Sequence, residues 1–468
     1  MRKIALFFLA SSLLLSCKNE KLPILAVVIT AEITEITTTS AKSGGTITSD
    51  GNAEITDRGI CWSMNPNPTT NDVKLSNGSG KGWFISDMTG LSGNTVYYVR
   101  AYAVNSEGTA YGKELKFTTE RGGSETYDLL DLKPGTLEAA VKSLGYIDVH
   151  DLKLGGIMDK RDFAWIQSGM KSLKVLDIED VTIAAYDNSP ANTIPAYAFI
   201  YNTELTEVIL PKNLVSIGKG AFIDCENLKG TLTVPENVKY IEANAFYGCI
   251  NLTGSLVIPG GVETIGTGAF ARCSGLNGTL TLPQSLKAIG KQAFYGCERL
   301  SGKLSIPEGI KTLENETFYN CEKIDELELP AGLTSIGENS FYFCTGFTGT
   351  LNLPASIKSI GKGAFAGCIG FTGGLIIPEK VVSIGEEAFR DCWGMDGMVS
   401  IPASVETIGG HAFNYCDNVT GFRVHWQTPI AYVGSYMLEK DKTVYVPTGT
   451  KPLYEAADGW KKHPIVEY

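Results

Sequence analysis

The sequence is poor in histidine, in positive charge and in long apolar runs. Four histidines among 468 residues leave little material for histidine-based catalysis or a histidine metal site. Forty Lys and Arg stand against 51 Asp and Glu, a net charge of −11 that no basic block offsets, which argues against nucleic acid as a partner. None of the 11 cysteines forms a C-x-x-C pair, which argues against zinc. We therefore expect no metal and no cofactor.

The one strongly apolar run lies at the amino terminus. Residues 4–15 are apolar except for two serines, too short for the ~20 residues of a membrane-spanning helix but suited to a secretory leader. The run ends in Leu14-Leu15-Ser16-Cys17, which resembles the lipobox of bacterial lipoproteins. The resemblance implies that residues 1–17 are a lipoprotein signal peptide, that Cys17 is lipidated, and that 18–23 form a tether at the outer membrane or cell surface. The alternative is an ordinary leader that leaves Cys17 incidental.

Short alternating segments fill residues 24–119. Thr, Val, Ile and Tyr alternate between clusters of Gly, Asn, Ser and Pro, the pattern of a β-sandwich. Trp62 is the expected core tryptophan, and Leu91 to Tyr97 resembles the tyrosine corner of fibronectin type III domains. Fold alone implies no function, so we interpret this fibronectin type III/Ig-like module as a spacer, with ligand binding as the alternative.

A repeat of 23–24 residues occupies the rest of the chain. Phenylalanines recur at 199, 222, 246, 270, 294, 318, 341, 365, 389 and 413, and cysteines follow three places later from 225 to 416. Such a period, with leucines spaced L-x-x-x-x-L-x-L, is typical of leucine-rich-repeat solenoids. Each unit has an alternating strand ended by proline, with its leucines inward. One coil cannot bury these residues alone, so the coils stack at ~5 Å per unit beside a parallel ribbon.

The units closely resemble the BspA-type leucine-rich repeats of bacterial surface proteins, through their IGxxAFxxC and LxLP segments. The resemblance covers residues 193–421, with 120–126 as linker, 127–192 as amino-terminal cap and 422–468 as carboxyl-terminal cap. The expected fold is mainly β: a sandwich followed by a solenoid of about ten repeats with capped ends. The resemblance implies an adhesin-like role, binding an extracellular host protein or glycan, or another cell surface, without catalysis.

The nine repeat cysteines allow two interpretations. An exported protein permits a disulfide ladder. Each coil has one cysteine at the same place, so disulfides would have to join neighbouring coils two by two and would leave one of the nine cysteines over. We therefore favour a row of buried thiols beside the phenylalanines.

Tyrosines that directly follow the repeat phenylalanines are the candidate binding residues: Tyr247, Tyr295, Tyr319 and Tyr342. An exposed row of tyrosines can stack on sugars or be buried in a protein interface. The alternative is that each ring packs across the adjoining coil.

A second class of function is a surface glycan-processing enzyme or a polysaccharide-utilisation accessory protein. Glu326 and Glu328 lie two apart on one strand face, ~6–7 Å from each other, near the separations of glycosidase carboxylates. They lie on an expected open ribbon without the pocket that would raise one pKa. We therefore predict a noncatalytic binding protein.

Overall fold

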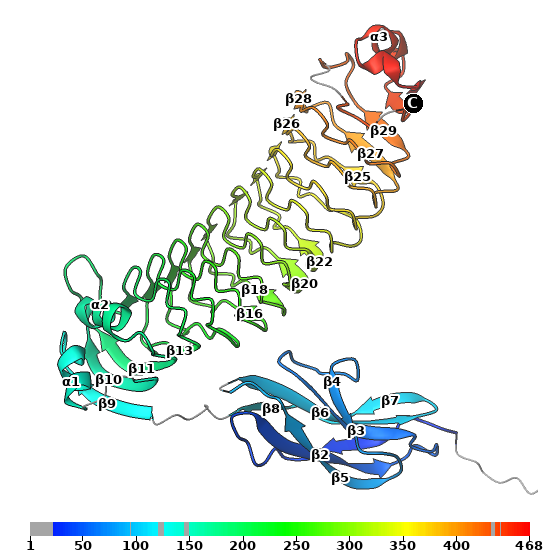
Figure 1. Cartoon of the computed structure of the whole chain (residues 1–468). Coiled ribbons are helices and arrows are strands. Elements are labelled where there is room, and N and C mark those ends of the chain that lie inside the picture. The colour runs from blue at the N-terminus through cyan, green and yellow to red at the C-terminus, as the bar shows by residue number, and fades with distance from the viewer. Residues whose placement is uncertain (1–21, 94, 120–125, 145–148, 432–435, 440) are drawn as a thin grey trace, which may run out of the picture. The chain divides into compact units, whose positions relative to one another are not determined.

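The computed structural model describes residues 22–93, 95–119, 126–144, 149–431, 436–439 and 441–468. The chain divides near residue 121 into two compact units (Figure 1). The predicted lipobox, Cys17 included, lies outside the described residues.

The amino-terminal unit consists of two antiparallel sheets. One sheet has the order β1-β2-β5, from β1 (Val27–Thr30), β2 (Ser40–Ser49) and β5 (Gly82–Thr89). The other has the order β4-β3-β6-β7 with β8 on β6, from β3 (Asp57–Ser63), β4 (Val73–Ser76), β6 (Val96–Asn105), β7 (Gly108–Tyr111) and β8 (Leu115–Thr118). Their buried faces share one core that includes Trp62 and Phe84, and the backbone N–H of Ser92 donates to Tyr97 Oη at 3.0 Å.

The second unit begins with a parallel sheet that carries two helices. Its elements are β9 (Thr126–Leu132), α1 (Leu137–Ser143), β10 (Asp151–Met158), α2 (Lys160–Gly169), β11 (Val175–Ile183) and β13 (Glu207–Ile209), with strand order β13-β11-β10-β9. Asp159 and Asp162 form a capping box at the start of α2, which fixes where that helix begins. The helix places Phe163 edge-on against Phe199, with ring centroids 6.0 Å apart, at the beginning of the repeats.

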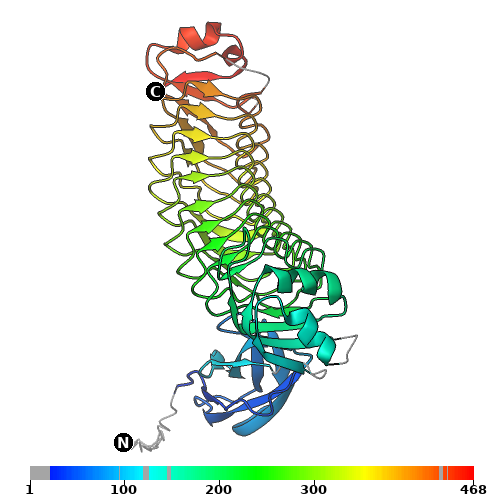
Figure 2. The ribbon, with the colours of Figure 1, turned by 90° about the vertical axis from the view of Figure 1, so that its left-hand side faces the viewer.

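The repeats form a solenoid, as predicted, with two ribbons of short parallel strands (Figures 1 and 2). The leucine ribbon comprises β16 (Leu256–Val257), β18 (Leu280–Thr281), β20 (Ser301–Ser305), β22 (Lys323–Glu328), β25 (Leu375–Ile376), β27 (Met398–Ile401) and β29 (Gly421–Val424). Leu280 and Leu282 point inward, as expected. However, residues 231–235 and 351–354 form no strand, so the predicted ribbon is interrupted.

The second ribbon, the isoleucine ribbon, was not expected. The repeat pattern leads us to expect a chain turn at Ile-Gly, whereas in the structure each isoleucine, or Leu313 in its place, ends a two-residue strand. These strands pair in parallel within two separate five-stranded sheets, which are divided between Ala288–Ile289 and Thr312–Leu313. The strands are β12 (Thr193–Ile194), β14 (Ser216–Ile217), β15 (Tyr240–Ile241), β17 (Thr264–Ile265), β19 (Ala288–Ile289), β21 (Thr312–Leu313), β23 (Ser335–Ile336), β24 (Ser359–Ile360), β26 (Ser383–Ile384) and β28 (Thr407–Ile408). Backbone pairing between coils therefore runs along two sides of the solenoid.

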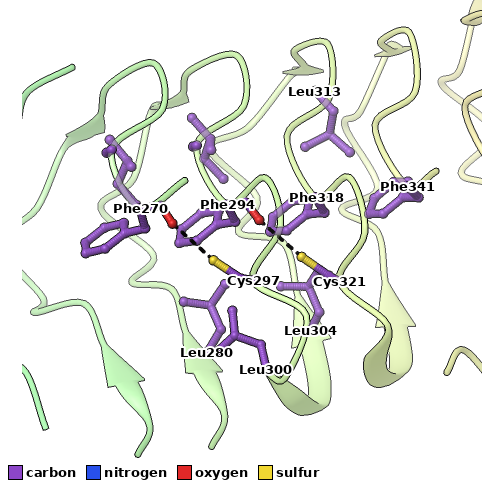
Figure 3. Packing of buried hydrophobic residues seen from close by; sticks show 14 of the residues in the cluster. Phe270, Leu280, Phe294, Cys297, Leu300, Leu304, Leu313, Phe318, Cys321 and Phe341 are labelled. Carbon is purple, nitrogen blue, oxygen red and sulfur yellow. Dashed lines mark hydrogen bonds between the residues drawn. The ribbon is translucent and has the colours of Figure 1, made fainter. Parts of the chain in front are cut away.

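A ladder of phenylalanine rings fills the solenoid axis (Figure 3). All ten repeat phenylalanines are fully buried, and consecutive rings stack with centroids 4.9–5.6 Å apart and planes within 14°. The ladder ends on an edge-on contact, Phe413 with Phe422 at 5.5 Å. Each coil thus buries its ring against the next, which confirms the stacking inferred from the period.

The nine repeat cysteines are free, buried thiols, as predicted. Each Sγ donates a hydrogen bond to the carbonyl oxygen of the ladder phenylalanine one coil earlier, as Figure 3 shows for Cys297 and Cys321. These distances range from 3.0 Å for Cys225 to 3.3 Å for Cys321. The first coil has Asn202 at the cysteine position; its Oδ1 accepts instead from the backbone N–H groups of Glu204 and Leu205. The thiols therefore act as small hydrophobes that also join neighbouring coils.

The native protein is expected to resist thiol alkylation at pH 8. Burial raises the pKa of Cys225 and of Cys297 to about 12, so almost none of either thiol is ionised at that pH. Iodoacetamide should label none of the nine repeat cysteines until denaturant is added, and then all nine without a reductant. Mass spectrometry of proteolytic peptides measures which cysteines are alkylated before and after unfolding. Repeat cysteines that stay blocked after unfolding would show disulfides and contradict the thiol row.

The carboxyl-terminal end buries aromatic side chains next to the last coils. It comprises β30 (Val444–Val446), α3 (Lys451–Ala456), a 3₁₀ turn (Trp460–Lys462) and β31 (Ile465–Glu467), with both strands added in parallel beyond β29. Trp460 and Tyr454 are fully buried, 5.2 Å apart in edge-on contact. Tyr454 Oη donates to the carbonyl of Trp426 at 2.9 Å, so the buried hydroxyl is satisfied.

Candidate binding surface

Three of the four predicted tyrosines form a continuous stack on the solenoid surface. The ring centroids of Tyr295 and Tyr319 are 4.6 Å apart, those of Tyr319 and Tyr342 are 4.9 Å apart, and both pairs lie within 12° of parallel. All three side chains are half-buried. Each ring therefore packs on the ring of the adjoining coil, as the alternative interpretation expects, while part of each side chain remains exposed.

The local backbone explains why these tyrosines point outward. A tight turn lies between two left-handed residues, such as Gln292 (φ 59°) and Gly296 (φ 68°). Within the turn Phe294 faces the core, and the next residue, Tyr295, faces the surface. Because the Phe ladder fixes the coil spacing near 5 Å, tyrosines on consecutive coils are held at stacking distance.

The fourth predicted residue, Tyr247, does not join the stack. The coil between it and Tyr295 has Ala271 at the equivalent place, which leaves a gap in the aromatic row. Tyr247 Oη instead lies 3.5 Å from Nη1 of Arg272 on the following coil. The four tyrosines are thus a stack of three and one separate residue.

Phe343 extends the stack and was missed in the sequence. Its ring lies 4.8 Å from that of Tyr342 at a tilt of 46°, and 41% of the residue is exposed. It occupies a left-handed position (φ 56°) where six other coils carry Gly, Asn or Asp, and where the remaining three carry Tyr201, Arg272 and Tyr415. A bulky aromatic residue at such a position is costly, and its presence in three coils is the signal that could have identified Phe343. We call Tyr295, Tyr319, Tyr342 and Phe343 the aromatic step.

The stacking limits the chemistry of the aromatic step. Both faces of the Tyr319 ring are covered by its neighbours, so its edge and hydroxyl are what a partner meets. Burial also raises the pKa of Tyr319, which keeps its hydroxyl protonated at neutral pH and able to donate or accept a hydrogen bond. Sugar rings bind mainly over free aromatic faces, whereas ring edges and hydroxyls suit a protein interface.

The two carboxylates considered for glycan cleavage lie on an exposed strand, β22. Glu328 is ion-paired with Lys303 at 3.0 Å and accepts a hydrogen bond from Ser305 at 2.7 Å. Ser305 and Lys303 lower the pKa of Glu328, the opposite of what a general acid needs at neutral pH. Glu326 is also exposed. This geometry does not favour catalysis at the pair.

Two features are absent from the residues that the structure describes. Groups of three or more His, Cys, Asp or Glu side chains able to hold a metal ion are not found in these ranges. Among the helices described there, none is long and apolar enough to cross a membrane.

Known proteins resemble the solenoid. A comparison with curated proteins found no match. Among solved structures, a Treponema pallidum leucine-rich repeat protein is 32% identical over 35% of this chain and 75% of its own, with a TM-score of 0.31. A Faecalibacterium prausnitzii protein described as a leucine rich cell surface protein is 20% identical over 69% and 93%, with a TM-score of 0.33. The pneumococcal vaccine antigen PcpA is 17% identical over 79% and 97%, with a TM-score of 0.40.

The repeat segment also matches a described family. Residues 192–301, 251–372 and 347–448 match the BspA type leucine rich repeat region in six copies, and together these matches span more than half of the chain. They cover the same coils whose Phe rings stack and whose thiols bond to the preceding coil. This chain therefore belongs to the BspA-type leucine-rich-repeat family.

Proposed function

We propose that this chain is a lipid-anchored, noncatalytic surface protein that binds a protein partner through the aromatic step. The observation that carries the proposal is the stack of Tyr295, Tyr319 and Tyr342 extended by the exposed Phe343. Tyrosine is enriched among the residues that dominate binding energy in protein interfaces. A protein of the host matrix or of another cell surface fits this chemistry better than a glycan, because the central ring, Tyr319, is covered on both faces.

The rigid setting of the aromatic step supports a binding role. Its tyrosines directly follow ladder residues that are fully buried, so the backbone that carries the stack is anchored in the core. A surface that is already ordered loses little conformational entropy when a partner docks. An ordered, half-exposed aromatic surface is therefore suited to contribute strongly to affinity.

Replacing the central tyrosine tests the docking surface. A Tyr319→Ala variant should weaken binding by about 2 kcal/mol, roughly 30-fold, since it removes the middle of the stack. Tyr247→Ala is the matched control, because that tyrosine also follows a ladder phenylalanine but lies outside the stack. The measurement is surface plasmon resonance against a panel of immobilised extracellular-matrix proteins and purified glycans. Equal affinities for both variants and the parent, or binding to glycans alone, would contradict the proposal.

The amino-terminal unit fits the role of a spacer. Two sheets over one core, the buried Trp62, and the Ser92 N–H donated to Tyr97 Oη support a fibronectin type III-like sandwich. In this proposal the sandwich separates the solenoid from the membrane, and the β9–β13 sheet and the 444–467 region cap the solenoid ends.

The proposed anchor is tested by supplying radioactive fatty acid to cells. The fatty acid should label the protein and fail to label Cys17→Ala; label that persists in Cys17→Ala would disprove the anchor.

A further inference from the structure

The outer face of the β1-β2-β5 sheet exposes large apolar side chains. Ile29 on β1 and Trp83 on β5 both lie opposite Thr46 of β2, so the three residues form one row across the sheet. Ile29 is 55% exposed and Trp83 is 75% exposed. Val27 and Ile85 extend the row along the outer strands and are also at least half exposed. Contiguous apolar patches of this kind on a soluble unit mark an interaction site.

The apolar patch occupies only one end of this face. Farther along the same strands, Lys42 lies opposite Asp87, and Lys42 Nζ is 3.8 Å from Asp87 and 2.6 Å from Glu35. Gly44, opposite Ile85, contributes no side chain between the two regions. The face is therefore apolar at one end and charged at the other.

The apolar end is where the chain enters the unit. The backbone N–H of Ile24 donates to the carbonyl of Gly51 at 2.7 Å, and Asn52 Nδ2 donates to the carbonyl of Leu22 at 3.2 Å. These contacts hold the entering segment beside the turn that follows β2. Lys81, two residues before Trp83, forms an ion pair with Asp50 in that same turn. Leu22 and Ile24 are themselves 82% and 59% exposed, which enlarges the apolar end.

The proposed anchor lies close to this end. Cys17 is five residues before Leu22, so the lipidated residue can lie at most about 18 Å from it along an extended chain. A short tether of this kind keeps the apolar end of the sandwich near the bilayer surface. The segment 18–121 carries ten Lys and Arg against eleven Asp and Glu, so little net charge opposes approach to anionic headgroups.

From this juxtaposition we propose that Val27, Ile29, Trp83 and Ile85, with Leu22 and Ile24, form a membrane-docking face that rests on the lipid surface holding the anchor. The inference builds on the proposed lipidation of Cys17. Indole rings favour the headgroup region, where an apolar body and a polar N–H are both accommodated. Shallow burial of aliphatic side chains adds to the acyl anchor and fixes which end of the sandwich faces the membrane.

Vesicles that carry brominated lipids test the docking face. The chain from Cys17 onward is coupled through that cysteine to a maleimide lipid in phosphatidylethanolamine–phosphatidylglycerol vesicles. The other ten cysteines are buried and should not react. Bromines in the acyl chains quench tryptophans that reach the membrane. We expect quenching in the parent, its loss in Trp83→Phe, and its retention in Trp393→Phe, since Trp393 is a 52%-exposed tryptophan of the solenoid.

A second pair of variants leaves the tryptophans unchanged. Ile29→Glu should reduce the quenching severalfold, whereas Ile376→Glu, at a more exposed site on the leucine ribbon, should not. Near-ultraviolet circular dichroism checks that each variant stays folded. Absence of quenching in the parent, or equal effects of the matched variants, would overturn the proposal. A dimer formed by the uncoupled protein and abolished by Trp83→Phe would also overturn it, because a second copy would then occupy the face.

Chemical coupling at Cys17 separates this inference from the proposed anchor. The proposed lipid anchor is rejected if fatty acid supplied to cells does not label Cys17. The docking face is tested in either case, because the maleimide supplies the tether. Quenching without cellular lipidation would thus support the face and reject the anchor.

Discussion

Phe318→Ala is expected to lower the free energy of unfolding by about 3–5 kcal/mol. The ring is fully buried and stacks on Phe294 at 5.3 Å and on Phe341 at 5.6 Å. Alanine would therefore leave a cavity at the centre of the ladder and remove two stacked contacts. Because each coil contacts only its neighbours, the solenoid should also lose cooperativity at this point and unfold as two blocks. Chemical denaturation followed by circular dichroism measures both effects.

The control for this variant is Phe343→Ala. Phe343 lies two residues after the ladder residue Phe341 in the same coil, but 41% of it is exposed. Its removal should cost less than about 1 kcal/mol and leave a single transition. Equal losses from the two variants would mean that the axial stack does not stabilise the solenoid more than surface rings do.

Gly290→Val is expected to destabilise the protein by about 1–3 kcal/mol through overpacking. A Cβ at Gly290 would lie 2.4 Å from the backbone nitrogen of Thr267 on the preceding coil. The atom in the way belongs to the backbone, so no side chain can rotate to make room. Three coils carry another residue at the equivalent place, Pro195, Glu242 and Glu314, so the requirement for glycine applies to the other seven coils.

Gly260→Val is the matched control for overpacking. A Cβ at Gly260 meets nothing within 4 Å, and its φ lies outside the left-handed region. We expect thermal unfolding to show a Tm near that of the parent for Gly260→Val and a clearly lower Tm for Gly290→Val. The same Tm for both variants would show that close contact between coils is not what demands glycine at 290.

The axial core of the solenoid could be predicted from the sequence because its residues recur with the 23–24-residue period. Each Phe and each Cys recurs at the same place in a coil, so their common burial follows once coils stack. The thiol bonds to the preceding coil could not be predicted, since they join residues 26 or 27 positions apart whose proximity exists only in the stack. The solenoid was thus predictable, and the bonds between coils were not.

The isoleucine ribbon and Phe343 show where sequence patterns fail. A strand such as Thr264–Ile265 has only two residues, too few for alternation to be recognised, and its partners lie a full repeat away. Phe343 gave little periodic signal because most coils carry Gly, Asn, Asp or Arg at that place, and its aromatic counterparts, Tyr201 and Tyr415, lie in the first and last coils. The tyrosines were found from their place after each ladder ring, but the gap at Ala271 divides them.

Deletion of one whole repeat tests the stacked-coil account most directly. Removing residues 278–301 joins Asn277 to Gly302, which occupies the same place in its coil as Gly278. Each remaining ladder ring then keeps a stacking neighbour, so we predict a folded protein with a cooperative thermal transition and a shorter long dimension in small-angle scattering. Removing only residues 278–289 puts the two sides out of register and should unfold the solenoid. A whole-repeat deletion that unfolds as readily as the half-repeat deletion would contradict the account.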